Sequence, residues 1–161
     1  MKNSYKNKNL KEKKFGNKKF KENSFLKKNF YKSIFNNCSF EKCDFWESNL
    51  SYAKFNNVKF KNCIFSDANL NKVIFKNSFL VNSNLSHTNL RGVDFETSKI
   101  DQVNFRDAIF DNKTKWPKNF NPLLFGAKKN IHLTKKIIKK KKSLTKIEKK
   151  IVHDLTLGKG F

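Results

Sequence analysis

A large apolar residue stands at every fifth position of the stretch 35–110, without interruption. The residue two places before each of them is small or β-branched, and the other positions are mostly polar. A period of five fits neither the 3.6-residue repeat of a helix nor the two-residue alternation of a strand. It predicts a coil that turns a corner every five residues, with one large and one small side chain pointing inward per side. The predicted core residues are Phe35, Phe40, Phe45, Leu50, Phe55, Phe60, Phe65, Leu70, Phe75, Leu80, Leu85, Leu90, Phe95, Ile100, Phe105 and Phe110.

Self-similarity at a fixed period is typical of solenoid proteins. The order small, polar, large, seen in Ala68-Asn69-Leu70 and Ser83-Asn84-Leu85, resembles the pentapeptide-repeat proteins. The resemblance implies an all-β solenoid, a right-handed quadrilateral β-helix with four repeats, or about twenty residues, per coil. Residues twenty apart are then expected to stack about 4.8 Å apart, the spacing of neighbouring strands. We expect about four to five coils.

The first thirty-two residues keep the five-residue period but change its small position. Lys13, Lys18 and Lys28 stand there, and burying an unpaired charge in a dry core costs several kcal/mol. The regular coil, 33–112, is therefore predicted to begin near Ser33. Residues 1–32 are expected either to fray or to form degenerate repeats whose lysines point outward.

The segment 113–127 is predicted to cap the solenoid. It is similar to a terminal segment common in pentapeptide-repeat proteins of cyanobacteria and plastids. An open solenoid end exposes apolar side chains and strand edges. We expect Trp116 and Phe120 to plug the core, and Pro117 and Pro122 to stop the hydrogen-bond ladder.

Residues 128–161 form a basic tail with a predicted amphipathic helix at about 145–157. Thr145 and Glu148 match a capping box, and Ile147 and Ile151 begin its apolar face. Two alternatives remain open for that face. The helix packs on its own solenoid, or it pairs with a second copy of the chain in a homodimer.

The net charge of +23 is concentrated at the two ends of the chain. Residues 31–112 are nearly neutral, whereas 1–30 and 113–161 are rich in lysine. Clustered lysines favour salt-sensitive binding to a polyanion, either nucleic acid or an anionic membrane surface. The candidate contacts in the tail are Lys135, Lys136, Lys139, Lys140, Lys141 and Lys142.

The candidate chemical groups form no recognisable site. Cys38, Cys43 and Cys63 fall on the small inward position and are expected to pack as small apolar groups, although Cys43 and Cys63 stack. The histidines form no cluster, and no phosphate loop or nucleophile motif is present. We therefore expect no enzyme activity, no cofactor and no bound metal.

Apolar residues at outward positions are the stronger indication of function. They are Ile34, Trp46, Tyr52, Ile64, Ile74 and Phe79. They favour a non-catalytic scaffold that binds an unknown protein partner. The alternative is a nucleic-acid or anionic-membrane-surface binder that acts through the lysine-rich terminal segments.

The sequence also bears on DNA mimicry and on location in the cell. Some pentapeptide-repeat proteins imitate duplex DNA and protect type II topoisomerases. That role requires a strongly acidic surface, which this sequence lacks. Neither a signal peptide nor a transmembrane stretch is recognised, so a cytoplasmic location is expected.

Overall fold

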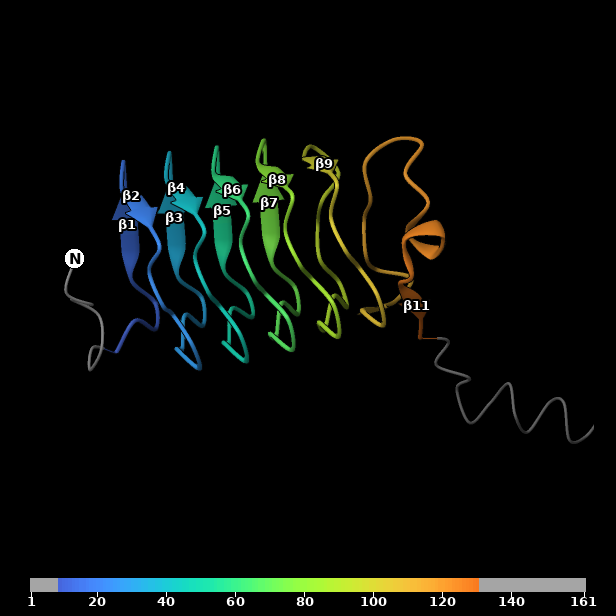
Figure 1. Ribbon diagram of the computed structural model, residues 1–161, viewed down its shortest axis with the longest axis horizontal. Helices are drawn as coiled ribbons and strands as arrows, with labels where there is room; N and C mark the ends of the chain where they lie inside the picture. Colours follow the sequence, from blue (N-terminus) through green and yellow to red (C-terminus); the bar gives the residue numbers. More distant parts are fainter. Residues whose placement is uncertain (1–8, 131–161) are drawn as a thin grey trace, which may run out of the picture. The chain divides into compact units, whose positions relative to one another are not determined.

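The computed structural model describes residues 9–130, which form a parallel β-solenoid of about six turns (Figure 1). Two of its four sides are sheets in which each strand pairs with the strand twenty residues later. The first sheet contains β1 (Lys14–Gly16), β3 (Ile34–Asn36), β5 (Lys54–Asn56) and β7 (Ile74–Lys76). The second sheet contains β2 (Lys19–Lys21), β4 (Ser39–Glu41), β6 (Lys59–Lys61), β8 (Phe79–Val81) and β9 (Lys99–Asp101).

Single parallel bridges with the same twenty-residue register hold the other two sides. The third side runs from Ser24 to Asn104 and the fourth from Asn29 to Ile109. The chain turns tightly on these sides, where for example the Ala53 amide donates to the Leu50 carbonyl at 2.9 Å. At the corners, nineteen non-glycine residues of the described chain have φ between 48° and 64°. Asparagine and aspartate tolerate this left-handed conformation better than most residues, which explains their frequency at the corners.

The core consists of four columns of large side chains. Fifteen of the sixteen predicted core residues are buried, and Ile100 is half-buried because β9 is the last strand of its sheet. Phenylalanine rings stack along the columns, with ring centroids 4.9 Å apart in the pair Phe35–Phe55. Each fully buried ring contributes about 1.5–3 kcal/mol, and ring stacking adds about 0.5–1.5 kcal/mol.

Small inward-facing side chains donate hydrogen bonds to backbone carbonyls of the preceding turn. The Ser33 hydroxyl donates to the Leu10 carbonyl at 2.6 Å, and Ser98 donates to the Phe75 carbonyl at 2.6 Å. In both pairs the donor comes twenty-three residues after the acceptor. A small side chain is required because the next turn lies only one strand spacing away.

The predicted start of the regular coil near Ser33 is wrong by about one turn. β1 and β2 already pair in register with β3 and β4. Lys13 and Lys18 fit this first turn because no earlier turn of the described chain covers them, and both are exposed. The described turns accordingly exceed the four to five that were expected.

Beyond Phe110 the segment predicted as a cap lies across the last turn of the core. Trp116 stacks on Phe95 with centroids 5.1 Å apart, and Phe120 stacks on Trp116 at 5.3 Å. Both side chains are half-buried. Pro117 is also half-buried, and the buried Pro122 opens a short 3₁₀ helix, η1 (Pro122–Phe125).

The chain then returns to the ladder for two residues. β11 (Lys128–Lys129) pairs in parallel with β10 (Ile109–Phe110). Asp111 anchors the turn before the cap, because its carboxylate accepts from the Gly92 and Lys113 amides, each at 3.0 Å. Although burial opposes ionisation, these bonds leave the pKa of Asp111 below its ordinary value.

Several predictions made for the tail lie outside the described residues. These are the helix at about 145–157, its docking or dimer contact, and the six candidate lysines of 135–142. Within residues 9–130, no helix is long and apolar enough to cross a membrane.

Removing one buried ring should destabilise the solenoid strongly. We expect Phe55→Ala to lower the free energy of unfolding by about 3–5 kcal/mol, because it leaves a cavity in a stacked column. Phe79→Ala serves as the control, since Phe79 is exposed on the same scaffold, and should change stability by about 0.5 kcal/mol or less. Urea unfolding measures both, and equal losses would contradict the assignment of Phe55 to the core.

A second stability prediction concerns two glycines with left-handed backbones. Gly126 has φ 82°, and a methyl group there would approach the Arg106 Cα to 3.1 Å. Gly92 has φ 66°, but its nearest neighbour is the flexible Lys72 Cγ at 3.2 Å. Each Ala substitution costs about 1–2 kcal/mol for backbone conformation alone. We expect the thermal midpoint to fall further for Gly126→Ala than for Gly92→Ala, because backbone cannot move aside as a side chain can.

Candidate interaction surface

The outer surface of the two sheets is strongly basic. We call it the lysine face and define it by the strands β1 to β9. Their outward lysines, all exposed, are Lys14, Lys19, Lys21, Lys54, Lys59, Lys61, Lys76 and Lys99. The same strands carry only two carboxylates, Glu41 and Asp101.

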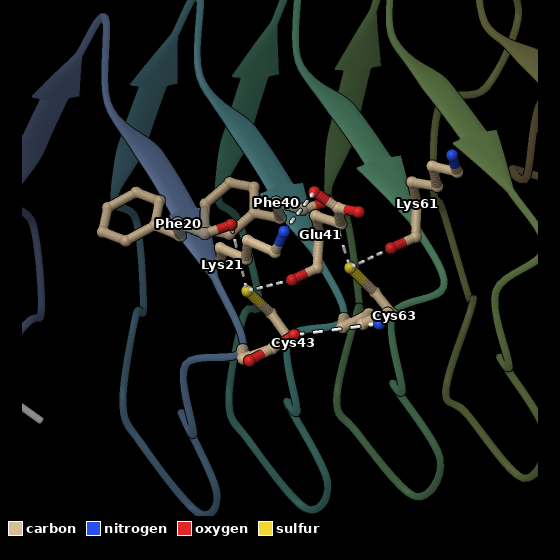
Figure 2. A network of polar contacts seen from close by, with 9 residues as sticks. Phe20, Lys21, Phe40, Glu41, Cys43, Lys61 and Cys63 are labelled. Atoms are coloured by element: carbon tan, nitrogen blue, oxygen red, sulfur yellow. Dashed lines mark hydrogen bonds and ion pairs between the residues drawn. The ribbon is translucent and has the colours of Figure 1, made fainter. Parts of the chain in front are cut away.

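Few of these lysines are neutralised within the chain. The ion pair among the strand residues is Lys21 with Glu41, at 3.9 Å between Nζ and Oε2 (Figure 2). Exposed ion pairs contribute only ~0–1 kcal/mol. The remaining ammonium groups therefore give this side of the described solenoid a positive potential that attracts acidic partners.

Two exposed apolar side chains lie toward the C-terminal end of the lysine face: Ile74 on β7, the last strand of the first sheet, and Phe79 between Lys59 and Lys99 in the second sheet. Ile74 is 37% exposed and Phe79 is 41% exposed. The Lys99 ammonium lies 5.6 Å from the centre of the Phe79 ring. A groove of about 500 Å³ adjoins the ring, and its walls are Asn57, Val58, Lys59, Asn77, Ser78, Phe79, Thr97 and Lys99.

Other carboxylates lie at the corner between the third and fourth sides, and Asp94 and Glu96 lie beyond Ile74 on the side of the first sheet. Glu47 pairs with Lys27 at 3.2 Å, and Asp107 pairs with Arg106 at 3.4 Å. Asp107 also pairs with Lys128, whose hydrogen bond holds the pKa of this carboxyl below its ordinary value. Asp67 accepts from the Trp46 indole N–H at 3.1 Å. The near-neutral stretch 31–112 is thus divided in space into sheets with exposed lysines and a corner where opposite charges pair.

This division was not predicted from the sequence, although the signal was present. Lys19, Lys59 and Lys99 are forty residues apart and so share one column of the second sheet. Lys14 and Lys54 share a column of the first sheet in the same way. Sorting charges by their position within the twenty-residue turn, rather than summing them, would have found the lysine face.

The outward apolar residues do not form one patch. Ile34 and Ile74 lie in one column of the first sheet, with Lys54 between them. Ile64, 44% exposed, lies in the third side, away from these sheets. Trp46 and Ile34 are half-buried.

The three cysteines are buried free thiols, and Figure 2 shows Cys43 and Cys63. Cys43 and Cys63 occupy the same position in successive turns, and the Cys63 thiol donates to the Phe40 carbonyl at 3.4 Å. The pKa of Cys63 is raised by the hydrogen bond with Cys43 and by burial, which both disfavour its thiolate. Burial likewise raises the pKa of Cys38. The hydrogen bond with Cys63 lowers the pKa of Cys43, but this thiol is fully buried. Burial away from solvent is the environment of a structural rather than a reactive cysteine.

The remaining candidate ligands are dispersed. His87 is exposed at a corner, while His132 and His153 lie outside the described residues. Residues 9–130 contain no cluster of three or more His, Cys, Asp or Glu side chains that could hold a metal ion.

The protein is a parallel β-solenoid, defined by its five-residue repeats, its twenty-residue strand register and its four-sided core. Two family profiles match the sequence: "Pentapeptide repeat region" over residues 54–115 and "Pentapeptide repeats (8 copies)" over residues 29–62. Together they span more than half of the chain. The chain belongs to the pentapeptide-repeat proteins.

Several solved structures are similar to this chain at low sequence identity. alr5209, a pentapeptide repeat protein from Nostoc PCC 7120, is 20% identical with a TM-score of 0.52, covering 63% of this chain and 84% of alr5209. HetL from Nostoc sp. strain PCC 7120, involved in heterocyst differentiation regulation, is 15% identical with a TM-score of 0.42, covering 62% and 46%. Full-length QnrB1, a plasmid-mediated fluoroquinolone resistance protein, is 13% identical with a TM-score of 0.27, covering 79% and 98%. No curated protein matches the sequence.

Proposed function

We propose that this protein is a non-catalytic scaffold that binds a protein partner on its lysine face. The observation that carries the proposal is the exposure of Phe79 between Lys59 and Lys99, with the exposed Ile74 on the preceding strand of the same turn. Protein interfaces commonly combine an apolar, aromatic centre with a polar rim. The partner is therefore a protein with an apolar side chain that enters the groove beside Phe79 and with carboxylates around it.

The backbone ladder supports this role. Phe79 is held by the pairing of β8 with β6 and β9, so its position is fixed before a partner arrives. Preorganised side chains lose less conformational entropy on binding. Lysines around the apolar centre would speed encounter and select acidic partners.

The resistance role of QnrB1 is not extended to this chain. QnrB1 is similar in fold only, at 13% identity. Eight lysines against two carboxylates on the strands of the two sheets also argue against an acidic, DNA-like surface there.

The proposed surface can be tested by photo-crosslinking in cells of the source organism. We expect benzoylphenylalanine in place of Phe79 to capture a discrete protein, because this position lies at the centre of the interface. The matched control carries benzoylphenylalanine in place of Ile64, which is equally exposed but lies on the third side. Captured bands are identified by mass spectrometry.

A charge-reversal variant sharpens the result. K59E/K61E in the crosslinking protein should abolish the adduct, because it reverses the charge of Lys59, which lines the groove, and of Lys61 on the same strand. The same adducts at both crosslinking positions, or adducts that nuclease treatment destroys, would contradict a protein partner on the lysine face.

A second candidate function is polyanion binding through the lysine-rich terminal segments, favoured by their concentration of charge. We expect full-length protein to bind a labelled DNA duplex with an affinity that falls steeply with salt. Each phosphate contact contributes about 0.9 to the steepness of the slope of log K against log salt concentration. Replacing Lys135, Lys136 and Lys139 to Lys142 with Gln should therefore reduce that steepness by about 5. An unchanged slope in anisotropy titrations would eliminate the tail as the binding site.

A further inference from the structure

Two tyrosines and three lysines form a second feature, separate from the lysine face. They lie where the fourth side meets the first sheet, and we call them the tyrosine–lysine corner: Lys11, Tyr31, Lys32, Tyr52 and Lys72. The Tyr31 and Tyr52 rings meet edge to face, with centroids 5.6 Å apart. Tyr52 is 39% exposed and Tyr31 is half-buried.

The ammonium groups of the three lysines lie against the two tyrosine rings. Lys11 and Lys32 lie over Tyr31, with Nζ 5.4 and 5.1 Å from the ring centroid. Lys72 lies over Tyr52 at 5.0 Å and donates to its phenolic oxygen at 3.0 Å. That hydrogen bond raises the pKa of Lys72, so this side chain carries its charge at neutral pH. Cation–π contacts thus collect three positive charges along one edge before any ligand binds.

Nearby carboxylates do not neutralise these charges. Glu12 stands one turn before Lys32 at the corner, yet none of the ion pairs within the described chain involves Lys11, Lys32 or Lys72. Asp111 lies further along this edge, but it accepts from backbone amides. The corner is therefore an unpaired positive edge with aromatic surface attached.

The spacing of the corner suits a chain of phosphates. Lys11, Tyr31 with Lys32, Tyr52, and Lys72 come from four successive turns, so at about 4.8 Å per turn the corner is roughly 14 Å long. Single-stranded nucleic acids bind proteins through such a combination, with lysines along the phosphates and aromatic rings under the bases. A narrow convex edge fits a flexible single strand better than a rigid duplex.

We propose that the tyrosine–lysine corner binds single-stranded nucleic acid, with Lys11, Lys32 and Lys72 contacting phosphates. A base packs against Tyr52, the more exposed of the two rings. This proposal does not rest on the protein scaffold role, since it uses different residues on a different part of the surface.

The first test compares two double variants that lose equal charge. Full-length K32Q/K72Q is titrated against a labelled oligothymidylate over a salt series, beside K59Q/K61Q on β6. Because each single-strand phosphate contact contributes about 0.7 to the salt slope, K32Q/K72Q should reduce the slope by about 1.4. At ~0.1 M salt this corresponds to a loss of up to roughly 25-fold in affinity. K59Q/K61Q should change the slope far less, and equal changes in the two variants would overturn the proposal.

The second test identifies the ligand and its place on the protein. We expect Y31A/Y52A, which keeps every charge, to weaken oligothymidylate binding and to leave inorganic polyphosphate binding nearly unchanged. Oligonucleotides containing photoreactive 4-thiothymidine should crosslink to Tyr31 or Tyr52, as mapped by mass spectrometry. Crosslinks confined to other residues would overturn the site. If binding to phosphatidylserine vesicles or to polyphosphate depends on Lys32 and Lys72 as strongly as binding to oligothymidylate does, the assigned ligand is wrong.

The Phe79 crosslink distinguishes the two proposals. K32Q/K72Q leaves the groove intact, so it should keep the protein adduct at position 79 while losing oligothymidylate binding. Loss of the adduct together with nucleic-acid binding would show one shared surface and overturn a separate corner site. Urea unfolding midpoints for all variants establish that each is folded.

Discussion

Every feature of the described solenoid depends on the twenty-residue register of its parallel hydrogen-bond ladder. Up to the cap, parallel pairing on all four sides places each residue one strand spacing from the residue twenty positions later; the register changes where Asp94 bridges to Lys115 and Ile109 pairs with Lys128. Like therefore stacks on like: phenylalanines form the core columns, and Asn56 donates to Asn36 at 2.8 Å on the surface. A single inserted residue would move every later side chain out of its column, so the uninterrupted period is a physical requirement of the fold.

The same register governs the charges, because like charges in one column repel. The first sheet separates Lys14 from Lys54 by Ile34, so two strand spacings lie between the ammonium groups. Where successive turns carry charge at the same position, the signs are opposite in most cases, as in Lys27 with Glu47, although Glu47 is followed by Asp67. The two arrangements of charge within a column have different effects on the surface potential. Opposite charges cancel on the third side, whereas alternation with uncharged residues leaves the lysines of the sheets free to attract a partner.

Sequence periodicity was sufficient to predict the core but not where the solenoid begins or how its surfaces are composed. Phe35 and its successors follow from the period alone, since no other regular structure places every fifth residue inside. The start near Ser33 was wrong because the small position is crowded only when an earlier turn lies beneath it. Lys13 is therefore acceptable in the first described turn and would be excluded from the next. The tyrosine–lysine corner also escaped prediction, because Tyr31 and Lys72 become neighbours only through stacking of turns.

A solenoid of this kind places its function on its surface. Its interior is filled by stacked rings and buried thiols, while the side chains that differ from turn to turn face outward. Turns of identical geometry hold Phe79 in a lysine-lined groove and Tyr52 on a lysine-lined edge. The backbone fixes both rings before a ligand arrives, so affinity at each place depends on which charges and rings share a column. Changing a single outward residue then alters what the surface binds without disturbing the fold, because the ladder and the inward columns carry the stability.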